Sequence, residues 1–90
     1  MVALSLGPQL TPSDGVITPT HDVHHVASGS IDTITVPSPD FTGFIMLISD
    51  GSCSYTTNDN IINSGTLSSY FNLCLYDKGT GKWAIMQVSN

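Results

Sequence analysis

The chain has no arginine and no glutamate, and its only two cationic side chains are Lys78 and Lys82. Charged residues make up 10% of the sequence, whereas a typical globular domain has roughly 25%. The absence of Glu and Arg removes two strong helix formers, and β-branched and turn-forming residues take their place. It also removes the groups that best bind phosphate or stabilise developing negative charge. The composition therefore predicts an all-β protein with a binding or structural role rather than a catalytic one.

The charge balance excludes two classes of partner. The formal net charge is −5 at pH 7, whereas nucleic acids and anionic membrane surfaces are bound through basic faces. Bidentate contacts to phosphates and bases also depend on arginine. The longest apolar run, Phe44–Ile48, is far too short to span a bilayer. We therefore expect neither a nucleic-acid partner nor a membrane partner.

A secretory signal is also lacking. Met1–Leu6 is short and uncharged and is followed at once by Gly7-Pro8, so neither a basic region nor a long apolar region is present. We therefore expect the protein to be made in a cytosol. In that setting Cys53 and Cys74 are expected to be buried thiols rather than a disulfide.

Residues 1–20 differ from the rest of the chain because they hold three prolines and an Asp14-Gly15 turn signal. Prolines at this spacing prevent a helix and remove ladder hydrogen bonds. We therefore expect an extended N-terminal arm, followed by a single small β-domain at residues 21–90. The arm has too many apolar side chains for a free tail, although a disordered terminus is the alternative. The side chains expected to lie on a partner surface are Val2, Leu4, Leu6, Leu10, Val16 and Ile17.

From His21 onward, short β-branched segments alternate with turn signals about every 8–12 residues, which is the spacing of a β-sandwich or small barrel. Asp50-Gly51 predicts a hairpin between the strands on either side of it. The sequence shows no internal repeat. We expect a small antiparallel β-sandwich or jelly-roll-like barrel. Its expected strands are residues 22–27, 31–36, 41–49, 53–57, 61–67, 69–76 and 82–88.

Two of these strands, residues 43–49 and 69–76, are apolar on both faces. An antiparallel strand in a lone two-layer domain usually alternates apolar and polar residues, so these strands need a second cover. We expect another copy of the chain to supply it, which predicts a homo-oligomer. The alternative is that the arm folds back over its own sheet. The candidate interface residues are Phe44, Met46, Ile48, Tyr70 and Trp83, of which Trp83 can equally belong to the core.

The segment His21–His25 is the one group of residues with metal-ligand chemistry. In a strand, His21 and His25 point to one face, while Asp22 and His24 point to the other. No single face of one chain then gathers three ligands, and a zinc site would need ligands from other strands or symmetry mates. We expect no metal site and interpret these histidines as hydrogen-bonding residues.

Catalytic signatures are also missing. All seven acidic residues are Asp, and most stand at turns, where Asp bonds to its own backbone. The sequence has no nucleophile elbow, no phosphate loop and no calcium loop. Lys78–Trp83 contains Gly, Thr and Lys but joins two expected strands, so we interpret it as a hairpin tip. We expect neither an enzyme nor a bound cofactor.

An ordered series of residues in Pro19–Gln87 resembles a small β-domain of tailed-bacteriophage virion proteins. Similar segments stand alone as capsid decoration (cement) proteins or end longer head-fibre and tail-fibre chains. The resemblance implies a trimeric β-sandwich or jelly-roll-like unit without catalytic residues. The series is His24-His25-Val26-x-x-Gly29…Ile31-x-Thr33-Ile34-x-x-Pro37…Gly43-x-Ile45-x-Leu47-Ile48-x-Asp50-Gly51…Thr56-Thr57-x-x-x-Ile61…Ser64-Gly65-Thr66-Leu67…Tyr76-Asp77…Gly81-Lys82-Trp83.

The resemblance implies a protein of the capsid surface, assembled in the host cytoplasm, whose homotrimer binds the major capsid protein. No shaft or coiled coil precedes the β-domain here, which fits a cement protein better than a fibre tip. On this interpretation the arm bridges neighbouring capsid subunits, and three arms per trimer act multivalently. The alternatives are a fibre tip that binds host glycan, for instance through Asn58–Asn60, and a cytosolic β-protein unrelated to virions.

Overall fold

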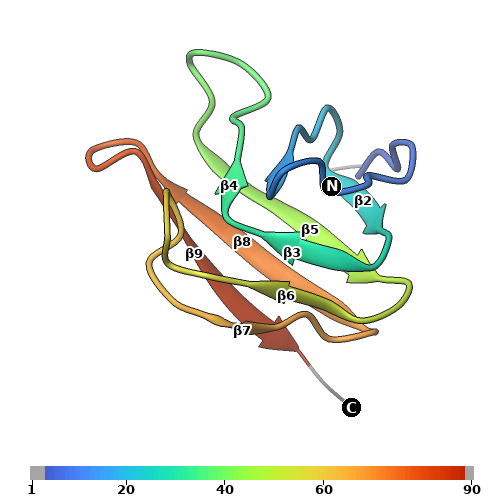
Figure 1. The fold of residues 1–90 in the computed structure, drawn as a ribbon. Helices are drawn as coiled ribbons and strands as arrows, with labels where there is room; N and C mark the ends of the chain where they lie inside the picture. The colour runs from blue at the N-terminus through green and yellow to red at the C-terminus, as the bar shows by residue number, and fades with distance from the viewer. Residues whose placement is uncertain (1–3, 89–90) are drawn as a thin grey trace.

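The computed structural model describes residues 4–88, and within that range the chain forms strands and no helix. The all-β prediction is therefore confirmed (Figure 1). The described strands are β1 (Val16–Ile17), β2 (Val23–Val26), β3 (Gly29–Ile31), β4 (Thr33–Ile34), β5 (Gly43–Ser49), β6 (Cys53–Tyr55), β7 (Gly65–Thr66), β8 (Phe71–Asp77) and β9 (Lys82–Val88).

One large sheet dominates the fold. The main sheet has the strand order β2-β5-β8-β9, and two smaller sheets, β3-β6-β7 and β1-β4, complete the described part of the molecule. Figure 1 shows β3, β6 and β7 crossing in front of the main sheet. The prediction of a small antiparallel β-sandwich or jelly-roll-like barrel needs correction in two respects. No closed barrel forms among residues 4–88, and the ladders β1–β4, β2–β5 and β3–β6 are parallel.

The parallel ladders arise because successive passes of the chain stack on one another as coils. In the main sheet, Leu6 lies beside Val23, and Val23 lies beside Met46. In the smaller sheets, Val16 lies beside Thr33, and β3 lies beside β6. The chain thus passes along the main sheet three times in the same direction, at residues 6–10, β2 and β5, although its sequence does not repeat. Backbone pairing makes this possible because it requires no particular side chain.

The predicted hairpin at Asp50-Gly51 is wrong. Both edges of β5 are already paired, with β2 on one side and β8 on the other, so β6 has no edge of β5 to bind. The segment turns a corner between sheets instead, and the Ser49 hydroxyl donates to the Gly51 carbonyl over 2.6 Å. The last predicted hairpin is confirmed: β8 and β9 pair over their whole length, from Phe71–Val88 to Asp77–Lys82.

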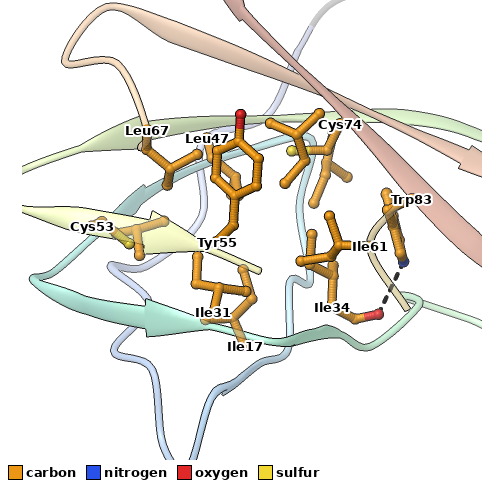
Figure 2. Close-up of a cluster of buried hydrophobic side chains, with 13 residues drawn as sticks. Ile17, Ile31, Ile34, Leu47, Cys53, Tyr55, Ile61, Leu67, Cys74 and Trp83 are labelled. Carbon is orange, nitrogen blue, oxygen red and sulfur yellow. Dashed lines mark hydrogen bonds between the residues drawn. The ribbon is translucent and has the colours of Figure 1, made fainter. Parts of the chain in front are cut away.

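The core lies between the main sheet and the smaller sheets. In Figure 2, Ile17, Ile31 and Ile34 point toward Leu47, Cys74 and Trp83 of the main sheet. The whole buried set is Ile17, Val26, Ile31, Ile34, Ile45, Leu47, Cys53, Tyr55, Ile61, Leu67, Cys74, Trp83 and Ile85.

Trp83 belongs to this core and is not an interface residue, which corrects its place among the candidate interface residues. Its side chain is fully buried, and its indole nitrogen donates to the Ile34 carbonyl over 3.0 Å (Figure 2). Its ring stacks on Phe41 with the ring centroids 5.8 Å apart and tilts against Tyr76 at 4.9 Å. The indole N–H needs a partner when buried, and a backbone carbonyl of the same chain supplies one.

The predicted arm pairs with its own domain. Ser5 and Gly7 bond to Val23, and Leu10 bonds to His25 and Ala27, so residues 5–10 line the outer edge of β2. The arm also contributes side chains to the core. Leu10 packs against the buried cluster, and Ile17 is part of it, so neither is free for a partner surface. Leu4, Leu6 and Val16 stay exposed, and Val2 lies outside the described residues.

His24 fastens the arm to the domain. The ring nitrogen Nδ1 lies 2.6 Å from the Pro8 carbonyl oxygen, while Nε2 accepts from the backbone amides of Thr20 and His21 at 2.9 and 3.0 Å. Two amide donors at Nε2 place the proton on Nδ1, which then donates to Pro8. A Cβ at position 7 would collide with the His24 ring, so Gly7 provides the room. One buried side chain therefore satisfies three backbone groups.

Replacing His24 with Ala is expected to lower the free energy of unfolding by about 3 kcal/mol, because it leaves a carbonyl and two amides without partners. Urea denaturation followed by circular dichroism measures the change. His25→Ala is the matched control, because His25 is partly exposed and bonds only to another side chain. That control is expected to cost less than about 1 kcal/mol. Equal losses in the two variants would contradict the fastening role of His24.

Candidate interaction surface

The main sheet has an apolar side that faces away from the core. Side chains alternate along each strand, so the neighbours of the buried residues Ile45, Leu47, Cys74 and Ile85 point outward. We call this side the outer face. Its members on the four strands are Val23, His25, Phe44, Met46, Ile48, Phe71, Leu73, Leu75, Ala84, Met86 and Val88.

The strand register aligns these side chains in rows across the sheet. Val23, Met46, Leu73 and Met86 are successive cross-strand partners, and Leu6 extends their row beyond β2. The most exposed side chains of the face are Leu6 (64%), Met86 (58%), Val88 (46%), Phe71 (45%), Leu75 (43%) and Phe44 (41%). Each exposes about half of a surface on the order of 150–200 Å², which leaves roughly 500 Å² of apolar area open. A patch of this size matches the largest apolar patch on a typical monomer, and such patches are often functional.

Charged groups lie only at the two ends of this face, as far as the described residues show. Asp77 and Lys82 are cross-strand partners at the turn between β8 and β9. At the other end, His25 Nδ1 lies 2.7 Å from Asp50 Oδ1, and the Gln9 amide donates to Asp50 Oδ2 over 2.8 Å. The hydrogen bonds from His25 and Gln9 lower the pKa of Asp50 from its ordinary value. An apolar centre with a polar rim is the anatomy of a protein–protein interface.

The structure brings most of the predicted interface residues together. The same face of β5 carries Phe44, Met46 and Ile48. Tyr70 is exposed and immediately precedes β8. Sequence reasoning missed Leu6, Met86 and Val88 as members of the same surface. Alternation along Lys82–Val88 could have indicated Met86 and Val88, since Trp83 and Ile85 are the expected core positions. No sequence pattern could have placed Leu6, because its position depends on pairing with Val23.

Both edges of the main sheet are covered over part of their length: β9 at Trp83 and Ile85, and β2 by the arm. On the β9 side, Ile62 donates to the Trp83 carbonyl over 2.9 Å, and Trp83 donates to the Asn60 carbonyl over 2.7 Å. The Asn63 side chain makes the two hydrogen bonds that a neighbouring strand would make. Its side-chain NH₂ group donates to the Ile85 carbonyl over 2.7 Å, and its side-chain oxygen accepts from the Ile85 backbone amide over 3.0 Å. On the β2 side the arm covers the edge. Covered edges prevent association by strand addition.

The histidines do not converge on a metal site. His24 is buried with its three backbone partners, His21 bonds to Thr20, and His25 bonds to Asp50. Among residues 4–88, no three His, Cys, Asp or Glu side chains lie close enough together to hold an ion. The surface that these residues form has no pocket.

The two cysteines are free and buried, as the sequence predicted. Cys53 lies on β6 and Cys74 on β8, in different sheets. Burial raises the pKa of the Cys53 thiol, and it raises the pKa of the Cys74 thiol from its ordinary value of 9.0 to about 12. Both thiols therefore stay protonated and act as small apolar core groups near neutral pH.

This pKa shift predicts that the protein loses stability as the pH rises from about 9 to about 12. In that window the unfolded Cys74 thiol releases its proton while the folded one keeps it, so the unfolded state binds fewer protons and is favoured. Cys74 adds a slope of up to about 1.4 kcal/mol per pH unit. Urea denaturation at several pH values, compared between the wild type and Cys74→Ala, isolates this slope. Identical slopes would contradict the buried, protonated thiol.

In the part of the chain that the structure describes, no helix is long and apolar enough to cross a membrane. Comparisons with protein-family models, with curated proteins and with solved structures found no match to this chain. What the protein does must therefore be inferred from its own residues, and the outer face is the feature that points to a function.

Proposed function

We propose that the protein is a structural component of a virus particle: a bacteriophage capsid decoration protein that forms a homotrimer on the shell and bridges major capsid subunits. The observation that carries the proposal is the outer face, which together with Leu6 leaves six large apolar side chains exposed. A surface of this kind serves protein–protein contact. The ordered resemblance to virion β-domains selects the virion among the possible assemblies.

The surface chemistry supports a structural role over a chemical one. The only two cationic residues of the chain, Lys78 and Lys82, lie at the tip of one hairpin, and Lys78 faces Asp40 at 3.8 Å. Developing negative charge, phosphate and metal ions all require concentrated charged or ligating groups. The protein acts without a cofactor, by contact alone, at the capsid surface after assembly in the host cytoplasm.

The arm has a double role in this proposal. Leu10 and Ile17 complete the domain, while Leu4 and Val16 remain exposed and available to the capsid. An arm that is fastened through His24 presents these side chains in fixed positions. A fixed presentation lowers the entropy cost of binding. The same proposal takes the main sheet and the smaller sheets as the two layers of a small β-sandwich.

A fibre tip that binds host glycan is the second candidate. Two adjacent exposed aromatics, Tyr70 and Phe71, favour it, because sugar rings stack on aromatic side chains and the nearby surface is rich in Ser, Thr and Asn. A glycan array separates the two functions. Specific glycan binding that is lost in Tyr70→Ala would favour the fibre tip, whereas an array without binding favours the decoration protein.

The decoration function predicts that each particle carries many copies of this protein. Quantitative mass spectrometry of purified particles, with the major capsid protein as internal standard, is expected to find hundreds of copies per particle. A multiplicity of that order follows from binding at repeated lattice positions. Only a few copies per particle would indicate a tail or fibre location. Complete absence from particles would overturn the virion proposal.

A further inference from the structure

We infer that the outer face, completed by Leu6 of the arm, is where the copies of the proposed trimer pack directly on one another around its threefold axis. The inference deepens the proposed function, because it names the contact that holds the oligomer together. It replaces the sequence-based interface with a surface whose central row is Leu6, Val23, Met46, Leu73 and Met86.

The covered edges exclude the usual alternative for a β-protein. Strand addition needs a free row of backbone groups. At Trp83 and Ile85 the β9 edge is occupied by residues 60–63, and β2 is occupied by the arm, whose Pro8 has no N–H to offer. At these positions the backbone of the main sheet is not open to strand addition, and the outer face is the larger surface that stays without a cover.

The charge distribution favours a copy of the same chain as the occupant. Each copy carries a formal charge of −5, so two copies repel unless the contact keeps their acidic groups apart. The smaller sheets carry Asp14, Asp32 and Asp59 at their turns. The centre of the outer face, in contrast, is apolar. Its rim at β8 and β9 carries both signs, Asp77 and Lys82, so opposite charges of neighbouring copies can meet there.

The size of the face also fits a copy of this chain. The roughly 500 Å² of open apolar area approaches the ~800 Å² that each partner buries in a standard interface. The half-buried side chains Met46, Ile48 and Leu73 fill the spaces between the exposed ones. Met46 and Met86 are unbranched and adapt their shape to an apolar surface, which helps identical faces to interlock.

Sedimentation velocity and light scattering on the full chain test this inference. The wild type is expected to sediment as a multiple of its 9.5 kDa mass. Met86→Lys places a charge at the end of the central row and is expected to raise the dissociation constant by at least ~30-fold. Met86→Leu keeps the apolar contact and is expected to associate as the wild type does.

Ser30→Lys is the matched control for added charge. Ser30 is exposed on β3, in a smaller sheet, so the same lysine there is expected to leave association unchanged. Met86 is exposed as well, so both lysine variants are expected to keep the wild-type circular dichroism and melting temperature. Leu6→Lys is expected to weaken association too, because Leu6 stands in the same row.

Three outcomes would overturn the inference: a wild type that stays monomeric at millimolar concentration, a Met86→Lys variant that associates normally, or a Ser30→Lys variant that dissociates equally. Its failure is distinguishable from failure of the proposed function. A monomer that still occurs in hundreds of copies on particles contradicts the self-contact and the homotrimer but leaves the decoration role standing. An oligomer that Met86→Lys dissociates but that is absent from particles contradicts only the virion role.

Discussion

Backbone pairing on both edges of β5 organises the rest of the molecule. β2 binds one edge in parallel and β8 binds the other antiparallel, so β5 joins the stacked coils of the first half of the chain to the final hairpin. Because β5 is apolar on both faces, its inner residues are part of the core and its outer residues lie in the middle of the exposed face. One face of β5 therefore belongs to the core of the fold, and the opposite face belongs to the exposed outer face.

The same need to satisfy backbone groups shapes the periphery of the main sheet. The arm, fastened by His24, covers the edge of β2, and residues 60–63 cover the edge of β9. A small β-protein with open edges risks uncontrolled strand addition. Once the edges are covered, contact with other molecules is left to side chains, which can specify a partner by shape and charge. In the proposed assembly, the apolar outer face is then the contact surface.

Two Asp-Gly pairs show why a local signal was not sufficient to predict the topology. Asp14-Gly15 closes a tight turn in which Ser13 and Val16 bond to each other, as the dipeptide predicts. Asp50-Gly51 has the same chemistry but turns a corner between sheets, because β2 and β8 already occupy β5. Local chemistry indicates that the chain turns, whereas the partners of the neighbouring strands decide where it goes.

The sequence by itself determined the all-β class, most strand positions, the buried thiols and the two apolar faces of residues 43–49. These features follow from composition and from alternation along a strand, which are local properties. Only the tertiary structure decided that the coils stack in parallel, that Trp83 and Ile17 belong to the core, and that Leu6 joins the outer face. Each of these features depends on which distant segment pairs with a given backbone group or packs against a given side chain. The pattern of residues along the sequence does not specify that partner.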